Sequence, residues 1–159
     1  MRYLATGLLL GLVFGGPACA AMSDDPLQAP IQHFIDSFNK GDLKSASEAF
    51  AKGNLSIIDE VRPYIWLGPD ALQNWAGDLI GDDKKDGVTN ESVTLGGAMR
   101  EETASDRAYV VEHAVYAFKD HGKAMREAAL MTFALTRGPN GWLISGWTWT
   151  GPKPKPAKH

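Results

Sequence analysis

Residues 107–150 read RAYVVEHAVYAFKDHGKAMREAALMTFALTRGPNGWLISGWTWT, and this stretch decides the fold. It is rich in Val, Thr, Tyr, Phe and Trp, which favour β-strands. Turn-forming residues at 104–106, 120–122 and 139–141 mark where one strand ends and the next begins, and Asn140-Gly141 favours a tight hairpin. Short turns of this kind join antiparallel neighbours, so the stretch predicts three antiparallel strands, over 107–119, 125–137 and 142–150.

The composition of residues 88–99 predicts a fourth long strand, and the chain begins with helices. A first helix is expected to begin at Pro30, because proline suits the first helical position, and to end at 39–41. Asp42 is suited to cap a second, short helix. The apolar faces of the two helices are formed by Ile31, Phe34, Ile35 and Phe38 and by Leu43, Ala46 and Phe50.

Two short strands and a third helix are predicted between these two helices and strand 88–99. Leu55, Ile57 and Asp59 alternate with their neighbours and therefore point to one side of a strand over 55–60. Strand-like residues resume at 64–67. A third helix is expected to open at Pro69 and to close at Gly81, with a charged loop over 81–87. Its apolar side is formed by Leu72, Trp75, Ala76 and Leu79.

Helices first and a long antiparallel run of strands afterwards predict one α+β domain with helices packed on one face of a sheet. We place this domain at 30–151, after a polar leader at 21–29. Residues 152–159 form a basic, proline-rich tail, which we expect to be extended in solvent because its composition suits neither helix nor sheet. A docking motif is the alternative interpretation of the tail.

The first twenty residues are typical of a signal peptide. Arg2 supplies the positive start, residues 4–14 are apolar, and Ala18-Cys19-Ala20 has the small residues of a cleavage site. We therefore expect cleavage after Ala20 and a protein that is secreted or periplasmic. Lipidation at Cys19 is the alternative, although Gly16 stands where that signal usually has Leu. No later stretch approaches the roughly 20 apolar residues of a spanning helix, so no membrane association is expected after cleavage.

The charge and the motifs of the chain exclude several classes of function. The net charge is −3 and becomes more negative when Arg2 is removed, which offers no general attraction to nucleic acid. Cys19 is the only cysteine, so the mature chain is expected to have no disulfide and no thiolate metal site. The sequence has no glycine-rich phosphate loop, no His-Glu-x-x-His and no clustered histidines, so neither a cofactor nor a metal is predicted.

The order helix, helix, strand, strand, helix and four long strands resembles the nuclear transport factor 2-like superfamily, which includes steroid delta-isomerases, polyketide-cyclase-like proteins and secreted bacterial members. The stretches that carry the resemblance are 31–34, 39–43, Phe50, 57–60, 66–69, Trp75 and 141–144. In that superfamily the sheet curls into a cone and the helices close one end over an apolar pocket. The resemblance therefore implies a cone-shaped, curled antiparallel sheet with the N-terminal helices on one face.

The resemblance also implies a position for a catalytic base. Steroid delta-isomerases carry an Asp base on the first strand, and Asp59 matches it. Their helix-one Tyr falls at Phe34, which has no hydroxyl, and the stretch 128–131, where their second donor lies, contains only Ala, Leu and Met. Without these donors, steroid isomerisation by the family's own residues is not expected. A structural alternative is that Asp59 bonds backbone where the strand breaks before Pro63.

Several other residues are candidates for the same pocket. His113 is expected to project into it and to pair with Asp59 as acid and base, and a hydrogen-bonded wall residue is the alternative. The predicted ligand-binding residues are Phe34, Tyr64, Trp66, Trp75 and Met131. Core filling explains the same aromatic residues equally well. The resemblance implies pairing through the sheet face opposite the helices, which would place Trp147 and Trp149 at a dimer surface. Glu112 and Glu127 are interpreted as structural carboxylates on a solvated face or paired with neighbours such as Arg126.

Three functions are compatible with these observations. The first is an exported binding module that encloses a small apolar or aromatic molecule, as a monomer or a homodimer. The second is an enzyme of the isomerase, dehydratase or cyclase type, with Asp59 as base and His113 or Tyr64 as partner. The third is a protein-interaction domain that works through its sheet face. The incomplete set of donors favours the first, because abstracting a proton requires a group that stabilises the resulting negative charge.

Overall fold

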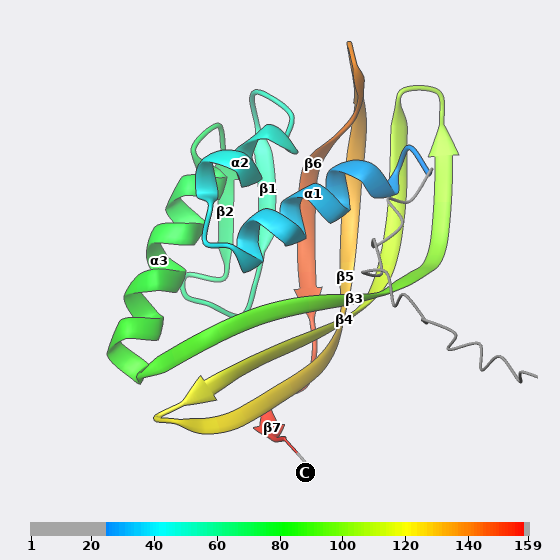
Figure 1. Ribbon diagram of the computed structural model, residues 1–159. Coiled ribbons are helices and arrows are strands. Elements are labelled where there is room, and N and C mark those ends of the chain that lie inside the picture. Colours follow the sequence, from blue (N-terminus) through cyan, green and yellow to red (C-terminus); the bar gives the residue numbers. More distant parts are fainter. Residues whose placement is uncertain (1–24, 158–159) are drawn as a thin grey trace, which may run out of the picture.

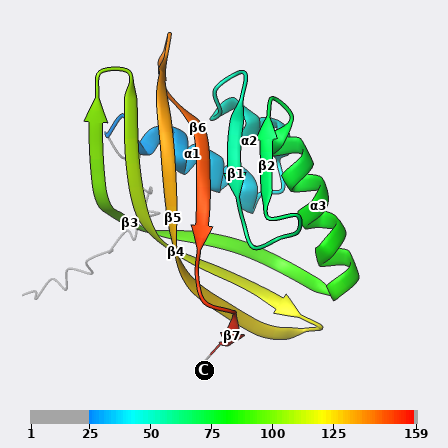
Figure 2. The same ribbon diagram turned by 180° about the vertical axis from the view of Figure 1, so that it is seen from behind.

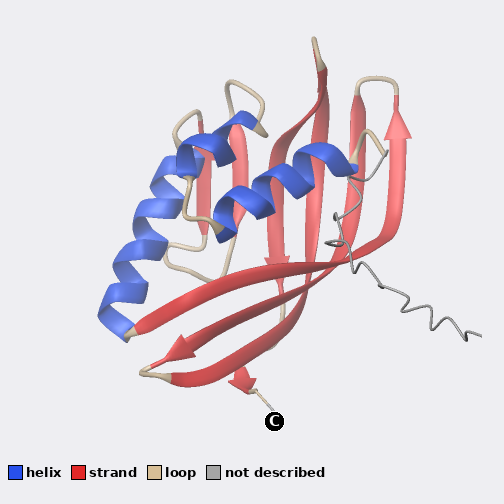
Figure 3. Ribbon diagram, viewed as in Figure 1, coloured by secondary structure: helices blue, strands red, loops and turns tan. Residues whose placement is uncertain are grey.

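The computed structural model describes residues 25–157. The predicted signal peptide, residues 21–24 of the leader and the last two residues of the tail lie outside this range. The described part contains helices and strands in the order α1 (Gln28–Asn39), α2 (Leu43–Glu48), β1 (Leu55–Ile58), β2 (Ile65–Gly68), α3 (Ala71–Asp86), β3 (Val88–Ala104), β4 (Arg107–Asp120), β5 (Lys123–Gly138), β6 (Gly141–Thr150) and β7 (Lys155–Pro156) (Figures 1 and 3).

The strands form one mixed sheet in the order β2-β1-β6-β5-β4-β3. The strand pairs are antiparallel except for one, in which β1 runs parallel to β6 with Ile57 opposite Trp147. The expected antiparallel sheet is therefore wrong at this single pair. Hairpin turns fix the directions of β3 to β6, whereas β1 and β6 are far apart in the chain and no turn dictates their relative direction.

The three helices cover one face of the sheet and leave the other uncovered (Figures 1 and 2). The long strands β3, β4 and β5 bend, so that one half of each continues the sheet outward from β6 and the other half sweeps toward the lower end of α3 (Figure 1). The register of β3 against β4 shifts at three places, after Thr89, Leu95 and Ala98, and such irregularities bend a strand. This confirms the predicted α+β fold with a curled, cone-like sheet.

Helix α1 packs its predicted apolar face on the sheet. Ile31, Phe34 and Ile35 are buried, and the Phe34 ring contacts that of Phe50 edge to face at 5.0 Å between centroids. The helix begins at Gln28, two residues before the predicted start. Asp42 caps α2 as expected, because its side chain accepts a hydrogen bond from the Ser45 amide at 2.9 Å.

Helix α3 is longer than the sequence predicts. It runs through Gly81 and the charged residues that follow, and it ends at Gly87, whose φ of +69° is left-handed. A glycine at this position ends a helix without steric cost, and Lys84 and Lys85 lie in the last turn, where positive charge is favourable. The predicted loop over 81–87 is therefore wrong, since one glycine within a helix is tolerated when the surrounding residues favour helix.

The tail is also more ordered than predicted. Lys155 and Pro156 form β7, which pairs with Arg126 and Met125 of β5, and the Ala157 amide donates to the Ala124 carbonyl at 3.0 Å. These residues are extended and exposed as expected, but the expectation that they would join no sheet is wrong, because proline is compatible with an edge strand. Among residues 25–157, no helix has the length and apolarity needed to cross a membrane.

Candidate functional site

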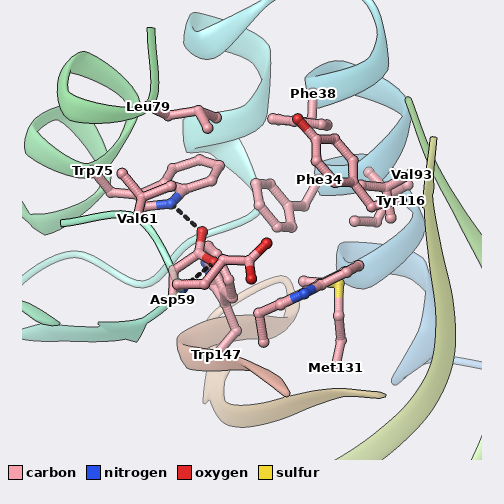
Figure 4. A pocket seen from close by; sticks show the side chains of 13 residues that line it. Phe34, Phe38, Asp59, Val61, Trp75, Leu79, Val93, Tyr116, Met131 and Trp147 are labelled. Atoms are coloured by element: carbon pink, nitrogen blue, oxygen red, sulfur yellow. Dashed lines mark hydrogen bonds between the residues drawn. The ribbon is translucent and has the colours of Figure 1, made fainter. Parts of the chain in front are cut away.

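An apolar pocket lies between α1, α3 and the concave face of the sheet (Figure 4). We call it the inner pocket. Its volume is about 60 Å³, and it is partly enclosed. It is lined by Phe34, Ile35, Phe38, Asp59, Glu60, Val61, Trp75, Leu79, Val93, Tyr116, Met131, Trp147 and Trp149. All but two of these residues are apolar or aromatic, and both exceptions are acids.

Asp59 follows directly after β1, on the same side as the buried Leu55 and Ile57. Its Oδ2 accepts a hydrogen bond from Trp75 Nε1 at 2.6 Å, drawn as a dashed line in Figure 4. Its Oδ1 accepts from the Glu60 backbone amide at 2.6 Å. Burial raises the pKa of Asp59 above its ordinary value, and the two hydrogen bonds oppose that rise because they stabilise the carboxylate.

Trp75 reaches the pocket from α3 and holds the aromatic wall together. Its ring meets that of Trp147 edge to face at 5.0 Å between centroids and packs on the Phe38 ring at 5.9 Å. Phe34 contacts Trp147 at 5.9 Å. The wall therefore combines side chains from α1, α3 and β6, and these contacts fix the orientation of the indole group that donates to Asp59.

A second acid, Glu60, lies beside Asp59. The pKa of Glu60 is raised to about 8, first by burial and then by the neighbouring charge of Glu127, a hydrogen bond shared with it and the charge of Asp59. Glu127 comes from β5, is 1 % exposed and accepts a hydrogen bond from Trp149 Nε1 at 2.8 Å. At neutral pH the folded protein therefore keeps a proton on Glu60.

A wider groove adjoins the inner pocket and shares Phe34, Phe38, Trp75 and Leu79 with it. We call it the outer groove, and its volume is about 250 Å³. Two acids line it, Asp83 of α3 and Glu91 of β3. The pKa of Asp83 is raised to about 7, first by burial and then by the charge of Glu91 and a hydrogen bond shared with Glu91.

Tyr116 links the inner pocket to the outer groove. Its ring lines the inner pocket, and its hydroxyl donates to Glu91 Oε2 at 3.1 Å. The ring stacks on Phe118 at 4.7 Å and meets Trp149 edge to face at 6.2 Å. Burial is the largest cause that raises the pKa of Tyr116, and the charge of Glu91 is the next, so the hydroxyl keeps its proton and acts as a donor.

The structure brings together only part of the predicted site. Asp59, Phe34, Trp75 and Met131 line the inner pocket. Trp66 is buried outside it and donates from Nε1 to Asp78 Oδ2 at 2.8 Å.

Two residues do not point into the pocket as expected. Tyr64 is 53 % exposed, because it lies in the turn between β1 and β2 rather than on a strand. His113 is exposed on the outer face of β4, whereas its neighbours Glu112 and Ala114 are buried. The predicted pairing of His113 with Asp59 is therefore wrong.

Two further expectations about orientation are wrong. Trp147 and Trp149 face the inner pocket and not a dimer surface. Glu112 and Glu127 are buried and not solvated, with exposed fractions of 0 and 1 %. Glu112 accepts a hydrogen bond from Gln28 Nε2 at 2.6 Å, and burial, the largest cause, raises its pKa.

Sequence reasoning missed Glu60 and Tyr116 as pocket residues. Strict alternation places Glu60 opposite Asp59, but β1 ends at Ile58 and the loop that follows turns both acids toward the pocket. Tyr116 lies on the inner side of β4, two residues beyond Ala114. Every second residue of β4 from Ala108 to Ala114 is buried, and this alternation is the signal that identifies Tyr116 as facing inward. Within residues 25–157, no three His, Cys, Asp or Glu side chains are placed to hold one metal ion.

No family model and no curated protein matches this chain. Solved structures match it in fold. A nuclear transport factor 2-like superfamily protein from Salmonella enterica matches with a TM-score of 0.64 at 16 % identity, over 80 % of this chain and 89 % of that chain.

Two further structures are of proteins named for their chemistry. A ketosteroid isomerase-like protein from Erwinia carotovora matches with a TM-score of 0.63 at 15 % identity, over 84 % of this chain and 100 % of that chain. A hexachlorocyclohexane dehydrochlorinase from Novosphingobium barchaimii matches with a TM-score of 0.66 at 12 % identity, over 82 % of this chain and 90 % of that chain. At these identities the likeness concerns the fold alone.

Proposed function

We propose, from the nuclear transport factor 2-like fold that this chain has, that the domain binds a small apolar or aromatic molecule in the inner pocket. The observation that carries the proposal is the lining of that pocket, in which apolar and aromatic side chains surround Asp59. Ligand sites are typically concave and mostly apolar, with a few polar groups that fix the orientation of the ligand.

The size of the pocket limits the ligand. A volume of about 60 Å³ accepts a compact group and not a whole sterol or polyketide. Because the inner pocket adjoins the outer groove, a longer ligand places one end inside and the remainder along the groove between α1 and α3. Asp59 and Glu60 are then the polar groups that meet the buried end.

Tryptophan fluorescence tests this proposal, because Trp75, Trp147 and Trp149 all line the pocket. We expect benzyl alcohol to change the emission saturably. Val61→Phe fills the pocket and is expected to weaken binding at least about tenfold. Leu67→Phe, on the exposed side of β2, is the matched control and keeps normal affinity. Equal affinity in both variants contradicts binding at this site.

A second candidate function is proton transfer, and the position of Asp59 favours it. The carboxyl group lies at the pocket, and burial raises its pKa, which suits a general base. Glu60 is the neighbouring acid that keeps a proton at neutral pH, so it takes the donor role for which His113 and Tyr64 are misplaced. The isomerase-like and dehydrochlorinase structures of the same fold agree with this kind of chemistry.

Asp59→Asn separates binding from proton transfer. The amide keeps the size of the side chain but removes the base. Once a converted substrate is identified, the variant is expected to lose at least about a hundredfold in kcat while its affinity for the substrate changes little. Unchanged turnover excludes Asp59 as the base.

We also propose that the protein is exported and acts outside the cytoplasm, on the support of the signal-like residues 1–20. Homodimerisation stays a prediction. If it occurs, the uncovered sheet face is the surface that remains for it, because Trp147 and Trp149 point to the pocket. Exposed apolar side chains on that face include Ile58, Ile65 and Leu67.

A further inference from the structure

We infer that the group bound in the inner pocket is a cation, of the class of compact alkylammonium groups. This inference rests on the proposed binding function and adds the charge of the ligand to it. It follows from three features of the described residues: the aromatic walls, the acids at the pocket, and the acids along the adjoining groove.

The aromatic walls suit an ammonium group. Six aromatic side chains line the inner pocket, from α1, α3, β4 and β6: Phe34, Phe38, Trp75, Tyr116, Trp147 and Trp149. Figure 4 shows the rings of Phe34, Trp75 and Trp147 around the Asp59 carboxyl group. An aromatic face attracts a cation placed within about 6 Å of its centre, and the attraction grows when the site is shielded from water.

The pocket is lined by acids and by no basic side chain. Asp59 and Glu60 line it, and none of the other described lining residues is Lys, Arg or His. The donors to Asp59 are the Trp75 indole and a backbone amide, which are neutral. No ion pair found among residues 25–157 includes either acid. Asp59 is half-buried, and a carboxylate shielded from water is normally paired with a positive charge, which a cationic ligand supplies here.

The neighbouring acids extend this pattern. Glu127, behind Glu60, is buried, and the donor to its Oε1 is the neutral indole of Trp149. Asp83 and Glu91 line the outer groove that adjoins the pocket. A ligand that enters along this groove meets acids and no basic side chain among the lining residues. Such a path attracts cations and repels anions, and a neutral molecule gains nothing from the acids.

Three probes of closely similar shape and different charge test the inference. They are tetramethylammonium, tert-butanol and pivalate, each with a central atom that carries at least three methyl groups. Binding is measured by tryptophan fluorescence and by amide chemical shifts of the full mature chain. We expect tetramethylammonium to bind at least about tenfold more tightly than tert-butanol, and pivalate more weakly than both.

Substitutions test which residues cause the preference for tetramethylammonium over tert-butanol. Asp59→Asn removes a charge from the pocket and is expected to bring tetramethylammonium to within about threefold of tert-butanol. Glu60→Gln is the second variant; because Glu60 keeps its proton below a pH of about 8, this variant is expected to reduce the preference at pH 9 and to leave it unchanged at pH 7. Glu102→Gln removes an exposed carboxylate far along β3 and is the matched control, which keeps the preference. Phe38→Leu retains apolar bulk without the ring, so it is expected to weaken the ammonium more than the alcohol.

The outcomes separate this inference from the binding function on which it rests. If tert-butanol binds as tightly as tetramethylammonium, the pocket is a binding site but the preference for a cation is wrong. If Glu102→Gln removes the preference as strongly as Asp59→Asn, the effect comes from net charge and the inference is also wrong. If neither these probes nor benzyl alcohol binds, the proposed function fails as well.

Discussion

At the scale of single residues, the hydrogen bond from Trp75 Nε1 to Asp59 Oδ2 fixes the acid in the pocket. Trp75→Phe removes the donor, and we expect a loss of about 2 kcal/mol in the free energy of unfolding, measured with urea. The pKa of Asp59, followed by carbon NMR of its carboxyl group, is expected to rise further because a contact that lowers it is lost.

Trp66→Phe is the matched control for this prediction. It breaks a similar bond, from Trp66 Nε1 to Asp78, outside the inner pocket. The variant is expected to lower stability without changing the titration of Asp59. If Trp75→Phe also leaves that titration unchanged, burial alone sets the pKa of Asp59.

The raised pKa of Glu60 predicts how the free energy of unfolding depends on pH. Its pKa is raised from 4.5 to about 8 in the folded protein, so the folded state holds a proton that the unfolded state has lost between these values. The free energy of unfolding therefore falls as the pH rises from about 5 to 8. Glu60→Gln is expected to reduce this fall by about 1 kcal/mol, a discounted value because the side chain is partly in water. Urea unfolding at several pH values measures it, and an equal slope in both proteins contradicts the prediction.

The orientation of single residues was the least predictable part of the site. Both sides of β4 carry apolar residues, so alternation alone does not reveal that Val110 and Ala114 face inward and His113 outward. The inner side also carries Glu112, which misleads any assignment based on hydrophobicity. Asp59 was predictable, because Leu55 and Ile57 before it define the buried side of β1.

At the scale of elements, two glycines, Gly81 in helix α3 and Gly87 at its end, are expected to have opposite effects on stability when each is replaced by alanine. Gly81 lies on the exposed side of the helix, and a Cβ there has open space. Gly81→Ala is therefore expected to stabilise the protein by about 1 kcal/mol. Gly87 has φ of +69°, and a Cβ there lies 2.9 Å from His121 Nε2, so Gly87→Ala is expected to destabilise it by about 1–2 kcal/mol.

Urea unfolding of the two variants tests whether α3 continues through Gly81. If Gly81→Ala destabilises the protein, the helix ends there as the sequence alone suggested.

The sequence predicted the existence of the helices and long strands well, because Phe34 and its spaced neighbours and the β-rich run after 107 give strong periodic signals. It mistook Gly81 for a terminus because glycine both ends helices and occurs within them.

At the scale of the whole molecule, the predicted signal peptide defines the mature chain. When the full-length protein is produced in a bacterium that exports it, we expect the intact mass to correspond to a chain that begins at Ala21. Cys19→Ser preserves the small residues of the cleavage site and is expected to be processed identically. Retention of residues 1–20, or a lipid-sized mass increase on Cys19, contradicts cleavage by this route.

The overall architecture was predictable from the order of elements, but the order of the strands in the sheet was only partly predictable. Turns at 104–106, 120–122 and 139–141 specify which long strands are neighbours. No local signal places β1 beside β6, because that pairing depends on the shape of the whole core. The same contact brings Phe50 to Ile144 and aligns Asp59 with the aromatic wall.

The parallel contact between β1 and β6 also has a consequence for when the chain folds. The carbonyl of Ile144 accepts from the Ala51 amide, and its own amide donates to Ala49, so early and late segments of the polypeptide must meet before the core closes. We expect this contact to form only after β6 has been synthesised, since it joins segments far apart in the chain. A nascent chain that stays open until then is one that a narrow export channel accepts.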